Sequence, residues 1–458
     1  MLTHALDDSS FQSRFNILVV TDNLEKAKTL APACQRRGQE LVYCLYNGDK
    51  IRGAIGKAPD AVLMVLTDFI EHAPRIKSAL RQHFGNITLP YIGALFREGR
   101  YEDQNTFDSI IYAPAHAVQI SQRVEAVLRL QRMEREILQR VQTYNEDFGI
   151  NCDFSLDAVE RPFNILFVGK ATPSFMSILN ALQNQNVNVT AAFSSYSAFN
   201  FLHDDDFDAV VMNALEDKEA SILIIETMRR NSRLYDVPVI FLAKDSVEEA
   251  ETIYNYGVHD IIQENADMPE LRGRILEAAN FHRIQLHMKK SLRDLRFDGC
   301  IDLASGMFNR TFLLHHLDRI VAQCREHKYE LSLIALKVQP NAPMHIPLDK
   351  IAQAENQVGG MIRSLLRSQD ISARIAKDTF ILVFPEQRFD TLNPIVQRIS
   401  GIVDCAAFDS GQNGSSGPFT MTIDSVKVSR MPHETAEQVL TNALSELTHK
   451  HEPISRTG

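Results

Sequence analysis

Nearly continuous apolar runs of five or six residues recur along the first part of the chain, separated by amphipathic segments. The runs NILVV from Asn16, AVLMVL from Ala61, YIGALF from Tyr91 and SIIYA from Ser109 are typical of strands buried on both faces. The segment LEKAKTLAPACQRRG, from Leu24, has helical periodicity. Strands that alternate with helices predict βαβ units and a parallel sheet.

The same succession of apolar runs appears twice, which indicates a duplicated domain. Three pairs of segments are each separated by 148 residues, and a fourth pair, DSIIY at Asp108 and HDIIQ at His259, follows with a small slip. The three pairs are FNILVV at Phe15 with FNILFV at Phe163, PDAVLM at Pro59 with FDAVVM at Phe207, and LPYIGALF at Leu89 with VPVIFLAK at Val237. We therefore predict two doubly wound α/β domains in tandem.

Each copy ends in a long helical pattern, over 117–144 in the first and 269–297 in the second. Two interpretations fit these patterns equally well. The helices either pack on their own domain and connect it to the next, or they pair between chains as a short coiled coil.

The segment from about Ile301 has a different rhythm, in which helices and strands follow the order α-β-α-β-β-α-β-α. This order predicts an α+β domain with a partly antiparallel sheet. The predicted elements are helices over 309–327, 348–368, 391–403 and 434–450 and strands over 330–338, 372–375, 378–384 and 419–429. The predicted domains are therefore 14–150, 162–296 and 297–458.

Composition narrows the function classes. A length of 458 residues fits about three domains. The formal net charge of −10 gives no overall attraction for nucleic acid or an anionic membrane. The six cysteines form no CxxC pair, which argues against a zinc site or a disulfide framework. With no signal-peptide pattern and only strand-sized apolar runs, we expect a cytoplasmic protein with no membrane insertion.

The repeated pattern resembles the receiver domain of bacterial response regulators, which takes phosphate on an aspartate with the help of Mg²⁺, a hydroxyl and a lysine. The family's functional positions lack this set of groups in both copies, so we expect pseudo-receivers. Asp68, three residues after Val65, is a conceivable substitute acceptor or an exposed loop carboxylate. The matching positions are Thr21, Asp22, Val65, Leu95 and Ala113 in the first copy and Gly169, Lys170, Asn213, Ala243 and Glu264 in the second.

The order of the three domains resembles the PleD-type diguanylate cyclases, whose output is a GGDEF domain. The stretch DLASGMFNRT, from Asp302, matches part of the signature that opens this domain in the family. The signature hairpin falls on AKDTF, from Ala376, where one acid and the Phe remain. The resemblance thus implies a multi-domain α/β protein with two flavodoxin-like domains and a nucleotide-cyclase-like α+β domain.

Most of the positions that the family uses for catalysis hold other residues. Cyclisation of GTP needs carboxylates that bind Mg²⁺. Asp378 is the one acid left in the hairpin, and the glycines that allow close backbone approach are absent. We therefore predict no cyclase activity, no metal site and no required cofactor. The replaced positions are Ala335, Ala376, Lys377 and Thr379 for catalysis and Pro343 and Ala352 for guanine recognition.

The family's product-binding motif, Arg-x-x-Asp, is present as Arg367 and Asp370, and a further family arginine matches Arg398. A guanidinium group can bind a guanine edge or a phosphate in two parallel bonds, and a carboxylate can accept from guanine nitrogens. The motif alone is weak, because Arg233 and Asp236 have the same spacing. Position before the hairpin makes Arg367 and Asp370 informative, and with Arg398 they are the candidates for cyclic di-GMP binding.

These observations favour a non-catalytic cyclic di-GMP effector. The resemblance implies protein partners in the cell-cycle machinery, an adaptor role in regulated proteolysis, a homodimer and recruitment to the cell pole. Two alternatives stay open. One is an active diguanylate cyclase with an unusual metal site, and the other is a protein scaffold that works without nucleotide.

Overall fold

The computed structural model divides the chain into two compact units, each with its own core. The receiver unit contains Arg14–Gln131 and Ser155–Met288, and the C-terminal unit contains Arg132–Phe154 and Lys289–Gly458. The residues that the structure describes are 15–53, 58–85, 89–96, 106–112, 115–155, 161–183, 185–244, 249–264, 266–327, 330–341, 346–387, 389–411, 418–430 and 433–451.

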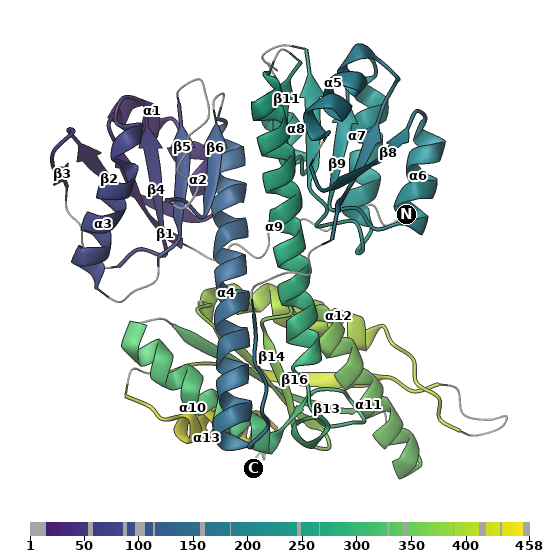
Figure 1. Cartoon of the computed structure of the whole chain (residues 1–458). Coiled ribbons are helices and arrows are strands. Elements are labelled where there is room, and N and C mark those ends of the chain that lie inside the picture. The colour runs from purple at the N-terminus through teal and green to yellow at the C-terminus, as the bar shows by residue number, and fades with distance from the viewer. Residues whose placement is uncertain are drawn as a thin grey trace. The chain divides into compact units, whose positions relative to one another are not determined.

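The first copy forms a sheet with the strand order β3-β2-β1-β4-β5-β6 (Figure 1). Its long strands are parallel, and the short β3 runs antiparallel to β2. Apolar clusters cover both faces of the sheet, which explains the continuous apolar runs. The strands are β1 (Phe15–Thr21), β2 (Gln39–Tyr46), β3 (Ile51–Arg52), β4 (Ala61–Leu66), β5 (Tyr91–Leu95) and β6 (Ser109–Tyr112). The helices are α1 (Leu24–Lys28), α2 (Ala31–Arg36), η2 (Ile70–His72), α3 (Ala73–Phe84) and α4 (Ala117–Asp147).

The second copy forms a parallel sheet with the order β11-β10-β9-β7-β8. Both copies thus show the 2-1-3-4-5 order of the flavodoxin-like fold, and the predicted doubly wound class is confirmed. The strands are β7 (Phe163–Val168), β8 (Val187–Ala192), β9 (Ala209–Asn213), β10 (Val239–Ala243) and β11 (Asp260–Gln263). The helices are α5 (Pro173–Leu182), α6 (Ser195–Asp204), α7 (Lys218–Arg230), α8 (Ala250–Asn255) and α9 (Met268–Asp294).

The prediction missed the second strand of each copy. Strand β2 alternates between buried and exposed residues, and β8 is mostly half-buried. These strands lie at or next to a sheet edge. In β8, Asn188 and Thr190 interrupt the apolar residues, whereas β2 contains the continuous apolar run LVYCLY, from Leu41, which the prediction missed.

The first part of α4 packs on its own domain. Ile120, Val124 and Leu128 are buried in the cluster that covers one face of the first sheet. The equivalent part of α9 does the same, with Leu271 and Ile275 buried against the second sheet. For these parts of the two helices, packing on their own domain is the correct interpretation.

Polar side chains join the two copies inside the receiver unit. Gln119 donates to Asp260 at 2.7 Å, and Asp260 also accepts from Arg274 at 2.5 Å. On the first copy, Arg123 donates to Ser109 at 3.1 Å and lies 3.6 Å from Glu277 of the second. Because these groups are largely buried, both copies depend on each other for hydrogen-bond partners.

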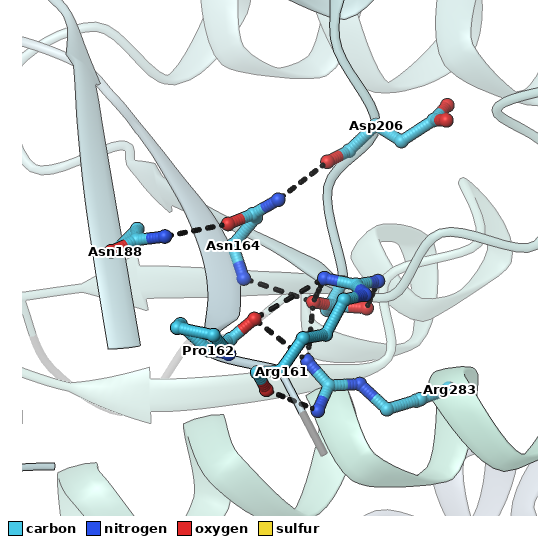
Figure 2. Close-up of polar contacts among 7 residues, drawn as sticks. Arg161, Pro162, Asn164, Asn188, Asp206 and Arg283 are labelled. Carbon is cyan, nitrogen blue, oxygen red and sulfur yellow. Dashed lines mark hydrogen bonds and ion pairs between the residues drawn. The ribbon is translucent and has the colours of Figure 1, made fainter. Parts of the chain in front are cut away.

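The start of the second copy is fixed to α9 through the buried carboxylate of Asp208. Arg161 donates to both of its oxygens, and Arg283 donates to one of them at 3.0 Å. Arg283 also donates to the backbone carbonyls of Arg161 and Pro162, and Figure 2 shows the two arginines side by side there. Asn164 donates through its backbone N–H to the same carboxylate, so Asp208 is a fully paired structural charge.

The third segment forms a sheet with the order β12-β14-β15-β13-β16, antiparallel except for the β12–β14 pair. One large apolar cluster fills the space between this sheet and the helices α11 and α12. The predicted α+β class is confirmed. The strands are β12 (Phe308–Asn309), β13 (Leu331–Pro340), β14 (Ile371–Ala376), β15 (Thr379–Pro385) and β16 (Met421–Ser429). The helices are η3 (Asp298–Cys300), α10 (Arg310–His327), α11 (Leu348–Leu365), η4 (Phe389–Leu392), α12 (Asn393–Asp404) and α13 (Ala436–His451).

The last turns of α4 belong to the C-terminal unit and are held there by buried charges. Glu136 accepts from Arg140 at 2.6 Å and lies 3.2 Å from His316 of α10. Arg140 donates to the carbonyl of Leu292, near the end of α9, at 2.9 Å. Within the described part of the chain, no helix is both long enough and apolar enough to span a bilayer.

Candidate functional site

Arg367 and Asp370 lie in a turn between α11 and β14. The predicted helix over 348–368 ends at Leu365 instead, so the motif is on a loop and not on a helix. One carboxylate oxygen of Asp370 accepts from the backbone N–H of Arg367 at 3.0 Å. The backbone N–H of Asp370 donates to the carbonyl of Arg367 at 3.1 Å. These bonds fix the turn and bring the two side chains to the same cavity.

That cavity has a volume of about 30 Å³ and lies within the C-terminal unit. Its walls come from the end of α4, from α10, from the turn between α11 and β14, and from the end of β15. The lining residues are Arg132, Arg135, Glu136, Gln139, Gln323, Arg367, Gln369, Asp370, Pro385, Glu386 and Gln387.

Two arginines of α4 contact one glutamate across this cavity. Arg132 Nε lies 3.1 Å from Glu386 Oε2, and Arg132 also donates to the backbone carbonyl of Glu386 at 3.3 Å. Arg135 forms an ion pair with the other carboxylate oxygen. The three side chains are only 13–17% exposed. Arg132 and Arg135 are three residues apart, which places them on one face of the helix.

Burial and the neighbouring arginines shift the pKa of Asp370 in opposite directions. Burial raises the pKa of its carboxyl group to about 6, although Arg367 and Arg132 act to lower it. The group is therefore ionised at neutral pH and becomes protonated in mild acid. An ionised Asp370 is an acceptor for two or more N–H donors of a ligand.

Arg398 stands apart from the other two predicted residues. It lies on α12 and donates to the carbonyl of Leu365, the last residue of α11. It is not part of the cavity lining. Arg140 donates to the carbonyl of Ser368 at 3.5 Å, so Arg140 holds the turn and Arg398 holds the end of the helix before it.

Sequence patterns did not reveal Arg132, Arg135 and Glu386. More than 230 residues separate the two arginines from Arg367 in the chain. They lie in a helix that the repeat assigned to the first copy, and the fold alone brings them to the turn. Their i,i+3 spacing was the one available signal, and many surface helices share it.

The hairpin between β14 and β15 holds one carboxylate, which already has partners. Thr379 donates to Asp378 at 2.8 Å, and Lys337 lies 3.9 Å from its other oxygen. Ala335 is buried in β13. Among the described residues, no group of three acidic, histidine or cysteine side chains could hold a metal ion. This arrangement does not fit the Mg²⁺ that the GGDEF resemblance implies.

Arg374, beside the hairpin, connects four groups. It donates to Asn356 at 2.6 Å and to Asp302 at 3.3 Å. It also donates to the carbonyl of Lys377 at 2.9 Å and lies 3.5 Å from Glu355. Arg374 is therefore engaged in holding the opening signature, α11 and the hairpin together. Pro343 lies outside the described residues, and Ala352 offers no polar side-chain atom.

In the first receiver-like domain, Asp22 fills a site made by backbone amides. Its carboxylate accepts from the N–H groups of Thr67, Asp68 and Phe69 at 2.7–3.0 Å. Val65 and Leu95, at the acceptor and hydroxyl positions, are buried apolar residues. Ala113 lies outside the described residues. Three amides that could bind an anion are thus already occupied by a side chain.

The second receiver-like domain pairs its residues differently. Asn213, at the acceptor position, donates to Thr172 at 3.1 Å. Lys170 forms an ion pair with Glu216 at 2.9 Å. Gly169 has a φ of +141°, and an added Cβ there would lie 2.6 Å from Asn213 Cβ. Ala243 and Glu264 supply neither the hydroxyl nor the lysine of the receiver pattern. An amide at the acceptor position cannot form an acyl phosphate.

The second Arg-x-x-Asp sequence makes no comparable site. Arg233 donates to the carbonyl of His203 at 2.7 Å and forms an ion pair with Asp206. Asp236 instead lies 3.9 Å from Arg129 and 3.4 Å from Gln285. The two side chains therefore serve different contacts, and spacing alone does not make the motif.

No family model matches this chain, and no curated protein matches it. Solved structures show a likeness to its separate parts. The GGDEF domain of DgcB from Caulobacter crescentus, solved with c-di-GMP, is 19% identical with a TM-score of 0.30, over 34% of this chain and 89% of that one. Diguanylate cyclase SiaD from Pseudomonas aeruginosa, solved with its activator SiaC, is 19% identical with a TM-score of 0.31, over 44% and 73%. A response regulator from Thermotoga maritima is 24% identical with a TM-score of 0.24, over 26% and 98%. At such identities and scores, the ligands and activities of those proteins do not carry over to this chain.

Proposed function

We propose that this chain binds cyclic di-GMP through Arg367 and Asp370 and does not synthesise it. The observation that supports binding is the meeting of Arg367, Asp370, Arg132 and Arg135 around one cavity. A guanidinium group can pair with a guanine edge or with a phosphate. The carboxylate of Asp370 can accept from the guanine N1 and N2 donors. Arg398 supports the turn from behind through the carbonyl of Leu365.

The hairpin supports the proposal that the chain does not synthesise the nucleotide. Attack of a ribose hydroxyl on an α-phosphate needs metal-bound carboxylates to stabilise the charge that develops. Here Asp378 is paired with Lys337 and Thr379. Alanine at 335 and 376 and lysine at 377 replace the other groups that the chemistry requires. The chain is therefore a reader of the nucleotide and not its source.

Calorimetric titration of the full chain with cyclic di-GMP tests the proposal. We expect saturable binding by the wild type and a loss of affinity of roughly 5- to 150-fold in Arg367→Ala, since one bidentate contact contributes about 1–3 kcal/mol. Arg325→Ala is the matched control, because Arg325 is an exposed residue of α10 and its replacement removes the same charge from the same unit. Absence of binding by the wild type would favour a scaffold that works without nucleotide.

A second assay addresses the enzyme class. Purified protein incubated with GTP and Mg²⁺ or Mn²⁺ is expected to give no cyclic di-GMP by chromatography, with an active diguanylate cyclase as the positive control. Product formation that is lost in Asp378→Asn would establish the alternative of a cyclase with an unusual metal site.

The architecture is also similar to that of PopA-like regulators, which are PleD paralogues. From this resemblance we propose an adaptor that, when loaded with nucleotide, delivers a cell-cycle regulator to a protease at the cell pole. Capture of partner proteins should then require cyclic di-GMP and should be lost in Arg367→Ala. Partner binding that is equal with and without nucleotide would contradict this role.

We further propose a homodimer, as the resemblance to PleD-type proteins implies. Light scattering coupled to gel filtration should give twice the monomer mass of 51.8 kDa. A monomer with and without ligand would remove this part of the proposal.

A further inference from the structure

Glu386 has an unusual backbone for its residue type. Its φ is +59°, and among the described residues it is the one non-glycine residue with a positive φ. A left-handed conformation costs roughly 1–2 kcal/mol for a residue with a Cβ. The position follows the last residue of β15, and its backbone N–H donates to the carbonyl of Glu330 at 2.9 Å. Such strain persists where surrounding contacts over-determine the residue.

Those contacts are the two arginines of α4. Arg132 and Arg135 both pair with the carboxylate of Glu386, and Arg132 also donates to its backbone carbonyl. All three side chains are mostly removed from water, where an ion pair is stronger than at the surface. Glu386 therefore pairs with both arginines that face the turn of Arg367 and Asp370 and offsets one of their two positive charges.

The cavity is too small for a nucleotide in this state. Its 30 Å³ accommodates about two water molecules, whereas small-molecule pockets measure roughly 300–1,000 Å³. The turn is held by its own backbone bonds and by Arg140, so it is the more rigid wall. The long side chains of Arg132 and Arg135 are the parts that can move without changing the backbone.

The other acidic side chains of the cavity have cationic partners of their own. Glu136 is already paired with Arg140 and His316, and Asp370 lies beside Arg367. A dianionic ligand could gain the two arginines of α4 only in exchange for the carboxylate of Glu386.

We infer that Glu386 is an internal competitor, a carboxylate that occupies Arg132 and Arg135 until an anionic ligand displaces it. The inference rests on the proposed cyclic di-GMP site and adds that the ligand must displace the carboxylate of Glu386 to bind there. Ligand binding exchanges one anion for another at the same two guanidinium groups. The affinity of the site is thereby set lower than its arginines alone would allow.

The variant Glu386→Gln tests this competition because it keeps the side-chain length and removes the charge. Calorimetry at fixed ionic strength should show a cyclic di-GMP Kd about five- to tenfold lower than that of the wild type. Glu330→Gln is the control, since Glu330 is exposed and lies across the strand pair from Glu386. Its Kd should stay within about twofold. Glu386→Asn, which tolerates a positive φ better, should act in the same direction as Glu386→Gln.

Inorganic pyrophosphate serves as a second probe that needs no guanine recognition. We expect Glu386→Gln to bind it more tightly than the wild type, and Arg132→Ala with Arg135→Ala in the Glu386→Gln background to lose that gain. If no protein binds cyclic di-GMP but this gain appears, the competition holds and the proposed function fails. If Glu386→Gln and Glu386→Asn gain affinity for neither probe while both remain folded by circular dichroism, the competition is overturned.

Discussion

The C-terminal unit contains two polar sites that differ in what their charges face. At the hairpin, the carboxylate of Asp378 is half-exposed and has a lysine and a threonine as partners. At the turn, Arg367 and Asp370 meet Arg132 and Arg135 in a largely buried setting. Both sites are built on the same sheet, one at the β14–β15 turn and the other at the start of β14 and the end of β15.

The comparison teaches that the fold can be kept while its chemistry changes. A metal site needs several oxygen ligands directed at one point, and the hairpin has one. An anion site needs N–H donors held against a rigid frame, and the turn has three arginines near it. This difference between the two sites is what the proposed function, nucleotide binding without synthesis, requires.

The largest effect should come from Arg140→Met, which tests whether the turn depends on buried charges of α4. The change leaves Glu136 buried without its main partner, and breaking such a pair costs about 3–5 kcal/mol. Urea unfolding followed by circular dichroism should show this loss, and cyclic di-GMP binding should weaken as the carbonyl of Ser368 loses its donor. Arg325→Met, on an exposed position, should change little. An unaltered unfolding curve would show that the turn is independent of α4.

A smaller loss of folding stability is expected for Arg374→Ala, which removes the side chain that connects the hairpin to Asn356 and Asp302. Its charged hydrogen bonds to Asn356 and Asp302 suggest a destabilisation of about 2–3 kcal/mol. The Kd for cyclic di-GMP should nevertheless stay within about twofold, because Arg374 does not line the cavity. A tenfold loss of affinity with an intact fold would mean that the two sites are coupled.

The pH dependence of binding sharpens the comparison next. Because the pKa of Asp370 is raised to about 6, its carboxyl group is mostly protonated at pH 5 and can no longer accept from two guanine donors. Calorimetry should therefore show a Kd that is roughly tenfold higher at pH 5 than at pH 7. The folding stability of the free protein should depend on pH in the opposite direction. A raised folded pKa stabilises the protonated form, and this contribution is lost as the pH rises through about 6.

Asp370→Asn is the control for that titration. It removes the ionisable group, so its weaker binding should not vary over the same pH range. A pH dependence of equal size in this variant would assign the titration to another group.

The smallest effect should come from Lys337→Ala at the hairpin. A pair at 3.9 Å with both partners more than a third exposed contributes well under about 1 kcal/mol, so stability should barely change. Freed of its lysine, Asp378 is still a single carboxylate, and titration with Mn²⁺ followed by electron paramagnetic resonance should show no tight binding. Tight Mn²⁺ binding would reveal ligands that the hairpin does not show.

The order of elements in all three segments followed from the sequence because their central strands are buried on both faces and read as unbroken apolar runs. Strands β2 and β8 were missed. In β8, polar residues interrupt the apolar ones, but the run LVYCLY of β2 is as continuous as those of the central strands and could have been found. The end of α11 was placed three residues too late. The stretch Leu366–Ser368 continues the helical pattern, and the hydrogen bond from Arg367 N–H to Asp370 that ends it depends on the turn.

For the candidate site, local patterns gave Arg367 and Asp370 but not their surroundings. Arg132, Arg135 and Glu386 come from two distant segments, and only packing of the last turns of α4 in the C-terminal unit brings them together. Arg398, which the resemblance also gave, donates to the backbone carbonyl of Leu365, and its role as a ligand residue stays a prediction. Spacing constrains where a Cα lies, and it does not fix which acceptor a long side chain selects.

The carboxylate of Asp22, seated on three backbone amides, has a consequence for how the chain takes in information. A phosphorylated receiver stores a past event, because a kinase writes a charge that persists after the stimulus has gone. Here the negative charge is that of the Asp22 side chain, which is always present. In the second copy, the amide of Asn213 lies at the position that a phosphorylated aspartate would occupy. In the receiver pattern, storage of this kind needs an acceptor carboxylate, and Val65 and Asn213 hold the acceptor positions here. Under the proposed function, the variable that the chain reports is then the concentration of its ligand at the time of measurement.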